Sequence, residues 1–273
     1  MFQLGGREVS MDKKVYEQWK TTRYTLNQTY TFDDTIAIEF PFTIFIQGEE
    51  FATIVCTPTH IEELTVGFLA SEGIILQTSD ITSIQIDETK GFVYIELHKT
   101  MPMIEHDHSK RFIGSCCGKS RQFYFKSDAR TARTIYTTTS ITVAQCVKLM
   151  NDMQEHSELF KATGGVHNTA LATSDAIITV REDIGRHNTL DKIYGHMLQQ
   201  HIRPSDKIIV FSGRLSSEAL LKVSKMGIGI IISNAAPTNL ALQLANDLQI
   251  TTIGFVRNEQ MNVYTYPERV KEG

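Results

Sequence analysis

From residue 176 onward, the sequence alternates between short apolar segments of strand character and longer segments of helical periodicity. Strands are expected at 176–182, 207–213, 228–233 and 251–257, with helices between them at 188–200, 216–227 and 238–248. Such alternation is typical of layered α/β packing around a largely parallel sheet. Residues 228–233 are almost entirely apolar, as expected of a strand that is buried on both faces.

The N-terminal part has a different pattern. Residues 36–56 alternate apolar and polar side chains on both sides of Gly48, which predicts a β-hairpin. A helix is expected next, because Thr59 and Glu62 have the spacing of a capping box. Residues 92–98 predict another strand. These elements indicate a smaller α/β unit ahead of the layered part.

A boundary between the two parts is expected near residue 140. Thr142 and Gln145 again have the spacing of a capping box, and they predict a helix over 143–159. We therefore expect an N-terminal α/β domain over 1–140 and a layered domain over 141–273.

Composition narrows the class of protein. The chain has 273 residues, is 41% hydrophobic and carries a net charge of -4 without a basic stripe, so no nucleic-acid partner is expected. The longest apolar run, near 226–232, is too short to cross a bilayer, and the N-terminus lacks an apolar signal core. Four cysteines are too few for a disulfide scaffold. These features predict a cytoplasmic protein without membrane association.

Two adjacent thiols are the main chemical feature. Cys116 and Cys117 lie in RFIGSCCGKSR, residues 111–121, between two glycines and close to several lysines and arginines. Nearby cations favour the thiolate, which is the reactive form of cysteine. Adjacent Cα atoms are about 3.8 Å apart, below the roughly 4.4 Å that ordinary disulfides need. The pair is therefore predicted to accept sulfur and not to form a structural disulfide.

Other roles for the cysteines are weighed against this one. Cys56 and Cys146 lie in apolar patterns and are expected to be buried. The adjacent pair could also be filler, although its surroundings are not apolar. Zinc would need two more ligands, and His106 and His108 lie nearby without any usual spacing, so no metal site is predicted.

Two strand-to-helix turns in the second part suit an anion. Ser212, Gly213 and Arg214 form one turn, and Ser233 to Thr238 form the other. Helix N-termini present N–H groups to anions, and arginines add forked donors. Arg186, Arg214 and Arg257 would supply these donors at the carboxyl ends of the strands. The alternative is that the serines only cap helices and the arginines are surface charges.

Seven blocks of this sequence together resemble a known family. They are CTPTHIEELTVGFLASEGII (56–75), SCCGKS (115–120), TGGVHNTALAT (163–173), REDIGRHNTLDK (181–192), FSGRLSSEAL (211–220), SNAAPT (233–238) and GFVRNEQMNVYT (254–265). In this order they resemble the formate dehydrogenase accessory sulfurtransferase family, FdhD/NarQ. The resemblance extends from about residue 36 to residue 269.

The resemblance implies a fold and an activity. The fold would be a small N-terminal α/β domain and a larger domain like that of cytidine deaminases, assembled as a cytoplasmic homodimer. The activity would be that of a persulfide-carrying sulfurtransferase. A cysteine desulfurase would supply the sulfur, and a molybdenum or tungsten cofactor with two pyranopterin guanine dinucleotides would receive it as bound substrate. Formate dehydrogenase would receive the sulfurated cofactor. A guanine nucleotide would serve as a mimic of that cofactor.

The resemblance also implies roles for residues. The family often carries Cys-x-x-Cys where this chain has adjacent cysteines, so the persulfide is assigned to Cys116 or to Cys117. The cofactor-binding stretch of the family matches Phe255, Val256, Arg257, Asn258, Glu259 and Gln260. Arg257 would contact phosphate there, and Val256 would contribute backbone and packing.

Two rival functions stay open, whereas a zinc deaminase is excluded by its missing motifs. A zinc deaminase needs H-x-E and P-C-x-x-C, but Asn168 and Thr169 follow His167 and no P-C-x-x-C occurs. His167 and His187 either hydrogen-bond in the cofactor pocket or are satisfied core histidines. A cofactor chaperone without sulfur chemistry would account for the anion-binding turns but not for the cysteine pair. A thiol redox sensor would account for the cysteine pair but not for the turns.

Overall fold

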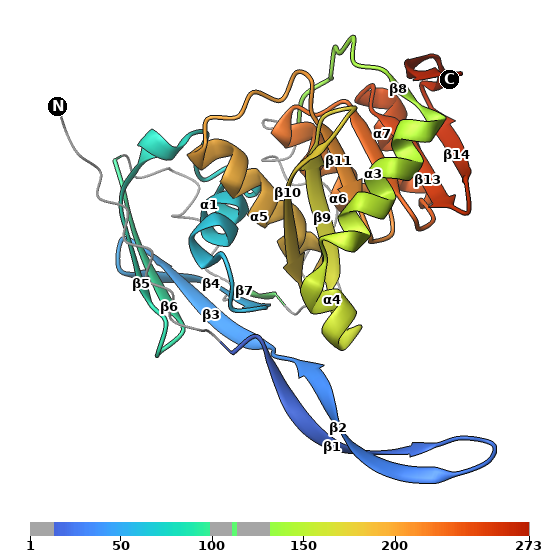
Figure 1. The fold of residues 1–273 in the computed structure, drawn as a ribbon. Helices are drawn as coiled ribbons and strands as arrows, with labels where there is room; N and C mark the ends of the chain where they lie inside the picture. The colour runs from blue at the N-terminus through green and yellow to red at the C-terminus, as the bar shows by residue number, and fades with distance from the viewer. Residues whose placement is uncertain (1–13, 99–110, 114–131, 273) are drawn as a thin grey trace, which may run out of the picture.

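The computed structural model describes residues 14–98, 111–113 and 132–272. Figure 1 shows a mixed α/β body from which one long β-ribbon extends. The predicted α/β class, with a layered C-terminal part and a smaller N-terminal part, is confirmed. Where the chain divides into domains stays a prediction.

A six-stranded sheet organises the C-terminal part. Its spatial order is β10 (Ile177–Asp183), β9 (His167–Ala172), β11 (Ile208–Phe211), β12 (Ile230–Ser233), β13 (Thr251–Arg257) and β14 (Gln260–Thr265). Only β11, β12 and β13 run parallel to one another, whereas β9, β10 and β14 pair antiparallel. The expectation of a largely parallel sheet is therefore wrong. Two tight reversals, before β10 and before β14, add antiparallel strands on both sides of the parallel centre.

Helices cover both faces of this sheet. On one face lie α5 (Arg186–Gln199), α6 (Ser217–Met226) and α7 (Asn239–Asp247), and on the other lies α3 (Val143–Glu155). Alternate side chains of β11 show the two layers, because Ile209 packs with α5 and α6 while Ile208 packs with α3. The sheet is thus buried on both sides.

One predicted capping box formed and the other did not. Thr142 and Gln145 cap α3 reciprocally, as expected. The helix ends at Glu155, before the separate short helix α4 (Glu158–Thr163), not at 159. Helix α1 (Ile61–Ser71) instead has His60 at its N-cap, in a left-handed conformation without a side-chain bond. The Thr59 hydroxyl is used elsewhere, since it accepts a hydrogen bond from Lys192.

The N-terminal sheet has the order β5 (Ile81–Asp87), β6 (Phe92–Leu97), β3 (Phe40–Ile46), β4 (Glu49–Cys56) and β7 (Arg111–Ile113). β3 and β4 form the predicted hairpin around Gly48. Helix α1 packs on one face of this sheet. A short 3-10 turn (Thr78–Asp80) precedes β5, and another (Pro267–Arg269) leads to β15 (Val270–Lys271), which pairs with β8 (Ile141–Thr142).

The two parts meet where α1 crosses α5. A Cβ atom added to Gly67 would lie 1.8 Å from the Asp191 carbonyl oxygen, and one added to Gly195 would lie 1.9 Å from the Glu63 carbonyl oxygen. The two helix backbones are therefore so close that no side chain fits between them at these glycines. At this crossing Arg181 also binds Glu63 through two nitrogens, at 2.5 and 2.8 Å.

We expect Gly67→Ala to lower the free energy of unfolding by about 3 kcal/mol or more, because overpacking here must separate two backbones. Urea denaturation would measure the loss. Gly165→Ala is the control, since its added Cβ would meet its nearest neighbour at an ordinary 3.5 Å. Equal stability of the two variants would contradict the close crossing.

Candidate functional site

The turns predicted to bind an anion lie side by side at one edge of the C-terminal sheet. Leu215, after β11, donates its backbone N–H to Ala236, after β12, and Thr238 donates its own back to Leu215. Phe255, near the end of β13, donates to Ala235. Because parallel strands end at the same side, the three chain reversals form one continuous rim. We call this rim, together with the starts of β9 and α5, the turn edge.

Predicted hydroxyl groups at the turn edge are already used by the fold. Ser212 accepts a hydrogen bond from the Asn168 backbone at 2.8 Å. Ser233 is buried, donates to the Gly213 carbonyl at 2.9 Å and accepts from Ala235. Thr238 caps α7. These side chains hold the turns against one another, so a ligand would meet backbone N–H groups and the neighbouring charged side chains.

Helix α5 brings Arg186 and His187 to the same edge. Its N-cap is Gly185, which provides no side-chain cap, whereas Ser216 and Thr238 cap α6 and α7. The Nε atom of Arg186 is buried and has no hydrogen-bond partner among the described residues. His187 lies 3.3 Å from the Glu218 carboxylate. The uncapped helix start and the arginine together suit an anionic group.

His167 begins β9 beside this helix start. It pairs with Asp183 across the strands and is half-buried. Burial, followed by the nearby charge of Arg186, lowers the pKa of its imidazole below the ordinary 6.5. The side chain is therefore neutral near pH 7 and able to donate one hydrogen bond and accept another.

The stretch from Phe255 to Gln260 forms the end of β13 and the turn into β14. Asn258 and Glu259 both have positive φ angles, as the two central residues of a type I′ hairpin turn require. Phe255 also has a φ of 55°, at a break in the pairing register. Arg257 is exposed, with its guanidinium carbon 5.6 Å from the Phe255 ring centroid. Val256 is buried in the core against α3, in the packing position expected for it.

The chain toward the cysteines leaves the described structure beside the turn edge. β7 runs parallel to β4 with Ile113 level with Ile54, so β7 ends two residues before the end of β4 at Cys56. The next residue of β4, Val55, accepts a hydrogen bond from Asn188 in the first turn of α5 at 2.9 Å. Cys116 and Cys117 lie outside the described residues, but the strand that leads to them ends near the α5 start.

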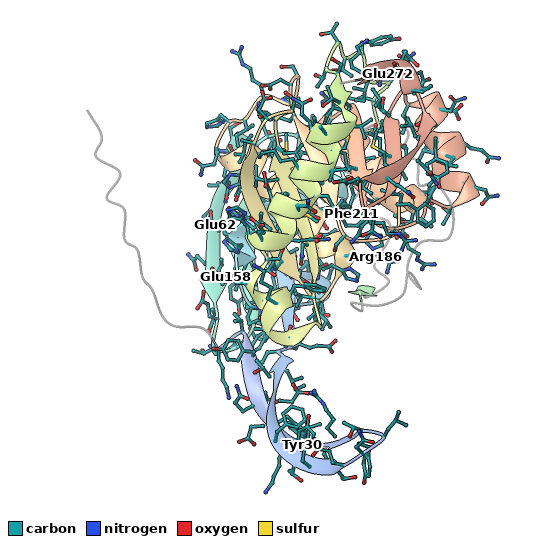
Figure 2. All side chains as sticks on the ribbon, turned by 45° about the vertical axis from the view of Figure 1, so that its right-hand side comes forward. Tyr30, Glu62, Glu158, Arg186, Phe211 and Glu272 are labelled. Atoms are coloured by element: carbon teal, nitrogen blue, oxygen red, sulfur yellow. The ribbon has the colours of Figure 1, made fainter. Side chains whose placement is uncertain are left out.

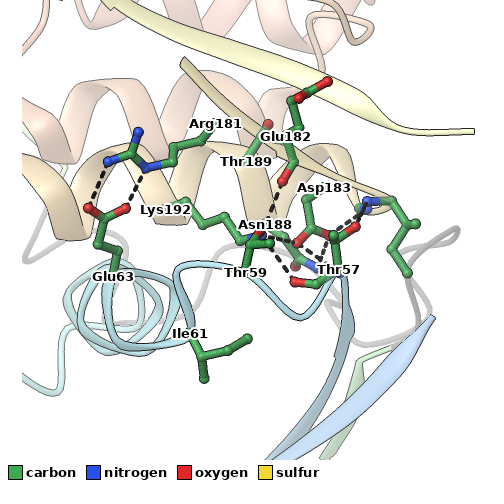
Figure 3. Close-up of polar contacts among 12 residues, drawn as sticks. Thr57, Thr59, Ile61, Glu63, Arg181, Glu182, Asp183, Asn188, Thr189 and Lys192 are labelled. Carbon is green, nitrogen blue, oxygen red and sulfur yellow. Dashed lines mark hydrogen bonds and ion pairs between the residues drawn. The ribbon is translucent and has the colours of Figure 1, made fainter. Parts of the chain in front are cut away.

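A buried ion pair fixes this junction (Figure 3). Lys192 lies 2.7 Å from Asp183, and both side chains are 0% exposed. Asp183 also accepts from the backbone of Thr57 and Gly185, while Lys192 donates to the carbonyls of Thr57 and Glu182. The pair therefore ties the end of β4 to the start of α5.

Comparison with known proteins matches the chain, over residues 37–271, to the FdhD/NarQ family. This chain belongs to the FdhD/NarQ family. It is 51% identical to a sulfur carrier protein FdhD of Bacillus licheniformis, over 96% of this chain and 99% of that one. It is 50% identical to the protein of the same name from Bacillus subtilis, over 96% and 100%.

A solved structure shows the same fold. It is described as a formate dehydrogenase accessory protein from Desulfotalea psychrophila, with a TM-score of 0.77 and 24% sequence identity over 94% of this chain and 100% of that one. Among the described residues, no group of three His, Cys, Asp or Glu side chains could hold a metal ion. No helix in the described part of the chain is long and apolar enough to cross a membrane.

For this FdhD/NarQ protein, the turns and the starts of β9 and α5 do meet at one edge, while their part in binding a cofactor stays a prediction. Sequence reasoning missed Asp183, Lys192 and Asn188, which hold the edge to the N-terminal part. They lie within the block at 181–192, in which sequence reasoning assigned roles only to Arg186 and His187. Charged residues are rarely fully buried, so nothing local in the sequence indicates their burial.

Asp183→Asn should lower the free energy of unfolding by about 3–5 kcal/mol, because it leaves a buried lysine without its counter-charge. Chemical denaturation would measure this, and adding Lys192→Met should recover part of the loss. Asp152→Asn is the matched control at the exposed pair with Lys148, expected to cost under about 1 kcal/mol. Equal losses at the two aspartates would contradict the account of this pair.

His167 should titrate below pH 6.5 when followed by NMR of its imidazole protons. Its stabilising contribution is then complete above about pH 6.5 and is lost as the pH falls through the lowered folded-state pKa, because the unfolded chain takes up the proton first. Arg186→Gln should move the midpoint upward by removing a nearby positive charge. Arg214→Gln, on the exposed neighbouring turn, should leave it in place. A midpoint unaffected by Arg186→Gln would contradict this assignment.

Proposed function

We propose that this chain is a sulfur carrier that serves formate dehydrogenase. Relatives that are about 50% identical over nearly their whole length bear the name sulfur carrier protein. The service to formate dehydrogenase follows from the family resemblance. The protein would act as a persulfide-carrying sulfurtransferase in the cytoplasm, with a cysteine desulfurase as donor and a homodimer as its assembly.

The observation that carries the proposal is where the cysteine-bearing segment begins. β7 ends at Ile113, beside the end of β4, and Asn188 joins that strand to the first turn of α5. Cys116 is three residues further along the chain. Three residues span at most about 10 Å, so the segment that carries the thiols leaves β7 close to the turn edge.

Sulfur would be taken up by thiol–disulfide-type exchange. The thiolate of Cys116 or Cys117 attacks the terminal sulfur of the desulfurase persulfide, which forms the carrier persulfide and releases the desulfurase thiolate. The remaining two cysteines are unsuited to this step. Cys56 and Cys146 are both 0% exposed, and burial raises the pKa of Cys146 to about 12.

The substrate that receives the sulfur would be the molybdenum cofactor with two pyranopterin guanine dinucleotides. Its phosphates would bind at the turn edge, where backbone N–H groups and three arginines are available. Arg186 supports this proposal most directly, since its buried Nε has no described partner. Arg214 and Arg257 are exposed and able to turn toward a bound phosphate. Guanosine diphosphate would then act as a mimic.

Sulfur loading is tested by incubating the protein with a cysteine desulfurase and sulfur-labelled cysteine, followed by non-reducing peptide mass spectrometry. We expect one reductant-labile sulfur on the peptide that contains Cys116 and Cys117, and its loss in the Cys116→Ala/Cys117→Ala variant. Single variants identify which thiol carries it.

Peptides that contain Cys56 and Cys146 are internal controls and should stay unlabelled, because these thiols are buried. Formate dehydrogenase activity in cells that carry the double variant gives a second readout. Loss of activity supports the proposal, whereas full activity with that variant would end it and favour a cofactor chaperone without sulfur chemistry.

A further inference from the structure

A cavity of about 430 Å³ lies where the β-ribbon leaves the body, and it shares no lining residue with the turn edge. The ribbon consists of β1 (Tyr16–Tyr24) and β2 (Thr29–Ala37), and α4 packs against its root. Figure 2 places Glu158, the first residue of α4, at the end of the body from which the ribbon with Tyr30 extends. We call this cavity the root pocket. Its volume is in the range of small-molecule sites.

Aliphatic side chains form part of the wall of the root pocket. Val15 comes from the ribbon root, Leu159 and Ala162 from α4, and Val180 from β10. Such a wall suits a hydrocarbon stem. The polar groups in the same lining then decide which head group the stem carries.

Two carboxylates line the root pocket, those of Glu158 and Glu182. Glu182 is held in place by the first turn of α4, since its two oxygens accept hydrogen bonds from the backbone N–H groups of Leu159 and Phe160, at 3.1 and 2.8 Å. Each carboxylate oxygen has more than one acceptor site, so Glu182 can accept further hydrogen bonds from a ligand.

Two imidazoles add further acceptors. Burial, followed by the charge of Arg181, lowers the pKa of His60 to about 4, so this ring is neutral near pH 7 and keeps one acceptor nitrogen. His156 donates from Nδ1 to the Asp152 carbonyl at 2.7 Å, which leaves Nε2 as an acceptor when the ring is neutral. The root pocket is therefore rich in acceptors.

The charge of the root pocket is negative. None of the described residues that line it is a lysine or an arginine. Two cations act on the neighbouring His60, but each is bound by a carboxylate of its own: Arg181 by Glu63 and Lys192 by Asp183. The lining thus favours a ligand that is cationic and donates hydrogen bonds.

We propose that the root pocket binds a guanidinium group on an aliphatic stem, as in an arginine side chain. A guanidinium has five N–H donors and no acceptor, stays charged, and stacks on aromatic rings. Tyr16 offers such a ring, since it lines the pocket and is 44% exposed. A metal ion does not fit, because no three His, Cys, Asp or Glu side chains of the described residues could hold one.

This binding does not depend on sulfur transfer and goes beyond the proposed function. Guanidinium groups occur both in free small molecules and in the arginine side chains of partner proteins. The chemistry that recognises the two is the same, so the test uses one probe for each source.

The test is a titration of the full ¹⁵N-labelled chain with n-butylguanidinium, followed through its backbone amide signals by NMR. We expect saturable shifts at 158–163 and 180–182, with a dissociation constant on the order of 1 mM or lower for a ligand of this size. n-Butylurea has a similar shape without the charge and should bind at least about tenfold more weakly.

Two variants locate the site. Ala162→Trp places a large ring at an exposed position of the wall and should abolish the saturable shifts at 180–182. Glu158→Gln removes one charge and should weaken binding at least about threefold. Glu155→Gln, at the exposed end of α3 and outside the lining, is the matched control and should leave the dissociation constant unchanged. Thermal unfolding checks that each variant is folded.

The peptide acetyl-Gly-Arg-Gly-amide distinguishes the two sources. Binding at least about tenfold tighter than that of n-butylguanidinium assigns the pocket to an arginine of a partner protein, and equal or weaker binding assigns it to a free small molecule. A natural chain that shows no saturable shift with either probe would overturn the proposal. So would equal binding of n-butylurea, or binding that Ala162→Trp and Glu158→Gln both leave intact.

Discussion

The buried pair of Asp183 and Lys192 is the contact on which the rest of the arrangement depends. Both charges are fully removed from water, which is tolerated because each also has several backbone partners. Those partners come from the end of β4, the end of β10 and the start of α5. One ion pair therefore fixes where the N-terminal sheet ends relative to the turn edge. The close crossing of α1 and α5 at Gly67 and Gly195 then sets the distance between the two parts.

Local patterns in the sequence predicted individual strands and helix caps well, but they predicted the direction of strand pairing less well. The strand at 251–257 and the Thr142–Gln145 cap formed as expected, because apolar runs and capping spacing act within a few residues. The predicted direction of strand pairing was wrong, because the antiparallel strands β9 and β14 were not predicted. β9 lies in a segment rich in small and polar residues, and the segment of β14 was considered only for its family resemblance. Thr59 could not be predicted correctly because its hydroxyl is taken by Lys192, more than a hundred residues away.

The turn edge shows the same division between what sequence can and cannot predict. Placing Ser212, Ser233 and Arg257 at one edge needed only that parallel strands end together. Their individual contacts depended on the packed fold: the two serine hydroxyls brace neighbouring turns, whereas the Arg186 guanidinium retains a donor without a described partner. The start of α5 with Arg186 is therefore the stronger candidate for an anion site, and the hydroxyl groups of Ser212 and Ser233 are weaker candidates.

The central claim is that the turn edge and the start of α5 form one nucleotide-phosphate site beside the cysteine-bearing segment. Hydrogen–deuterium exchange with and without guanosine diphosphate tests it most directly. The account predicts slower amide exchange at 185–188, 212–216, 234–238 and 254–260, with the ribbon strands at 16–24 and 29–37 unaffected. Protection elsewhere, or none at saturating nucleotide, would contradict it.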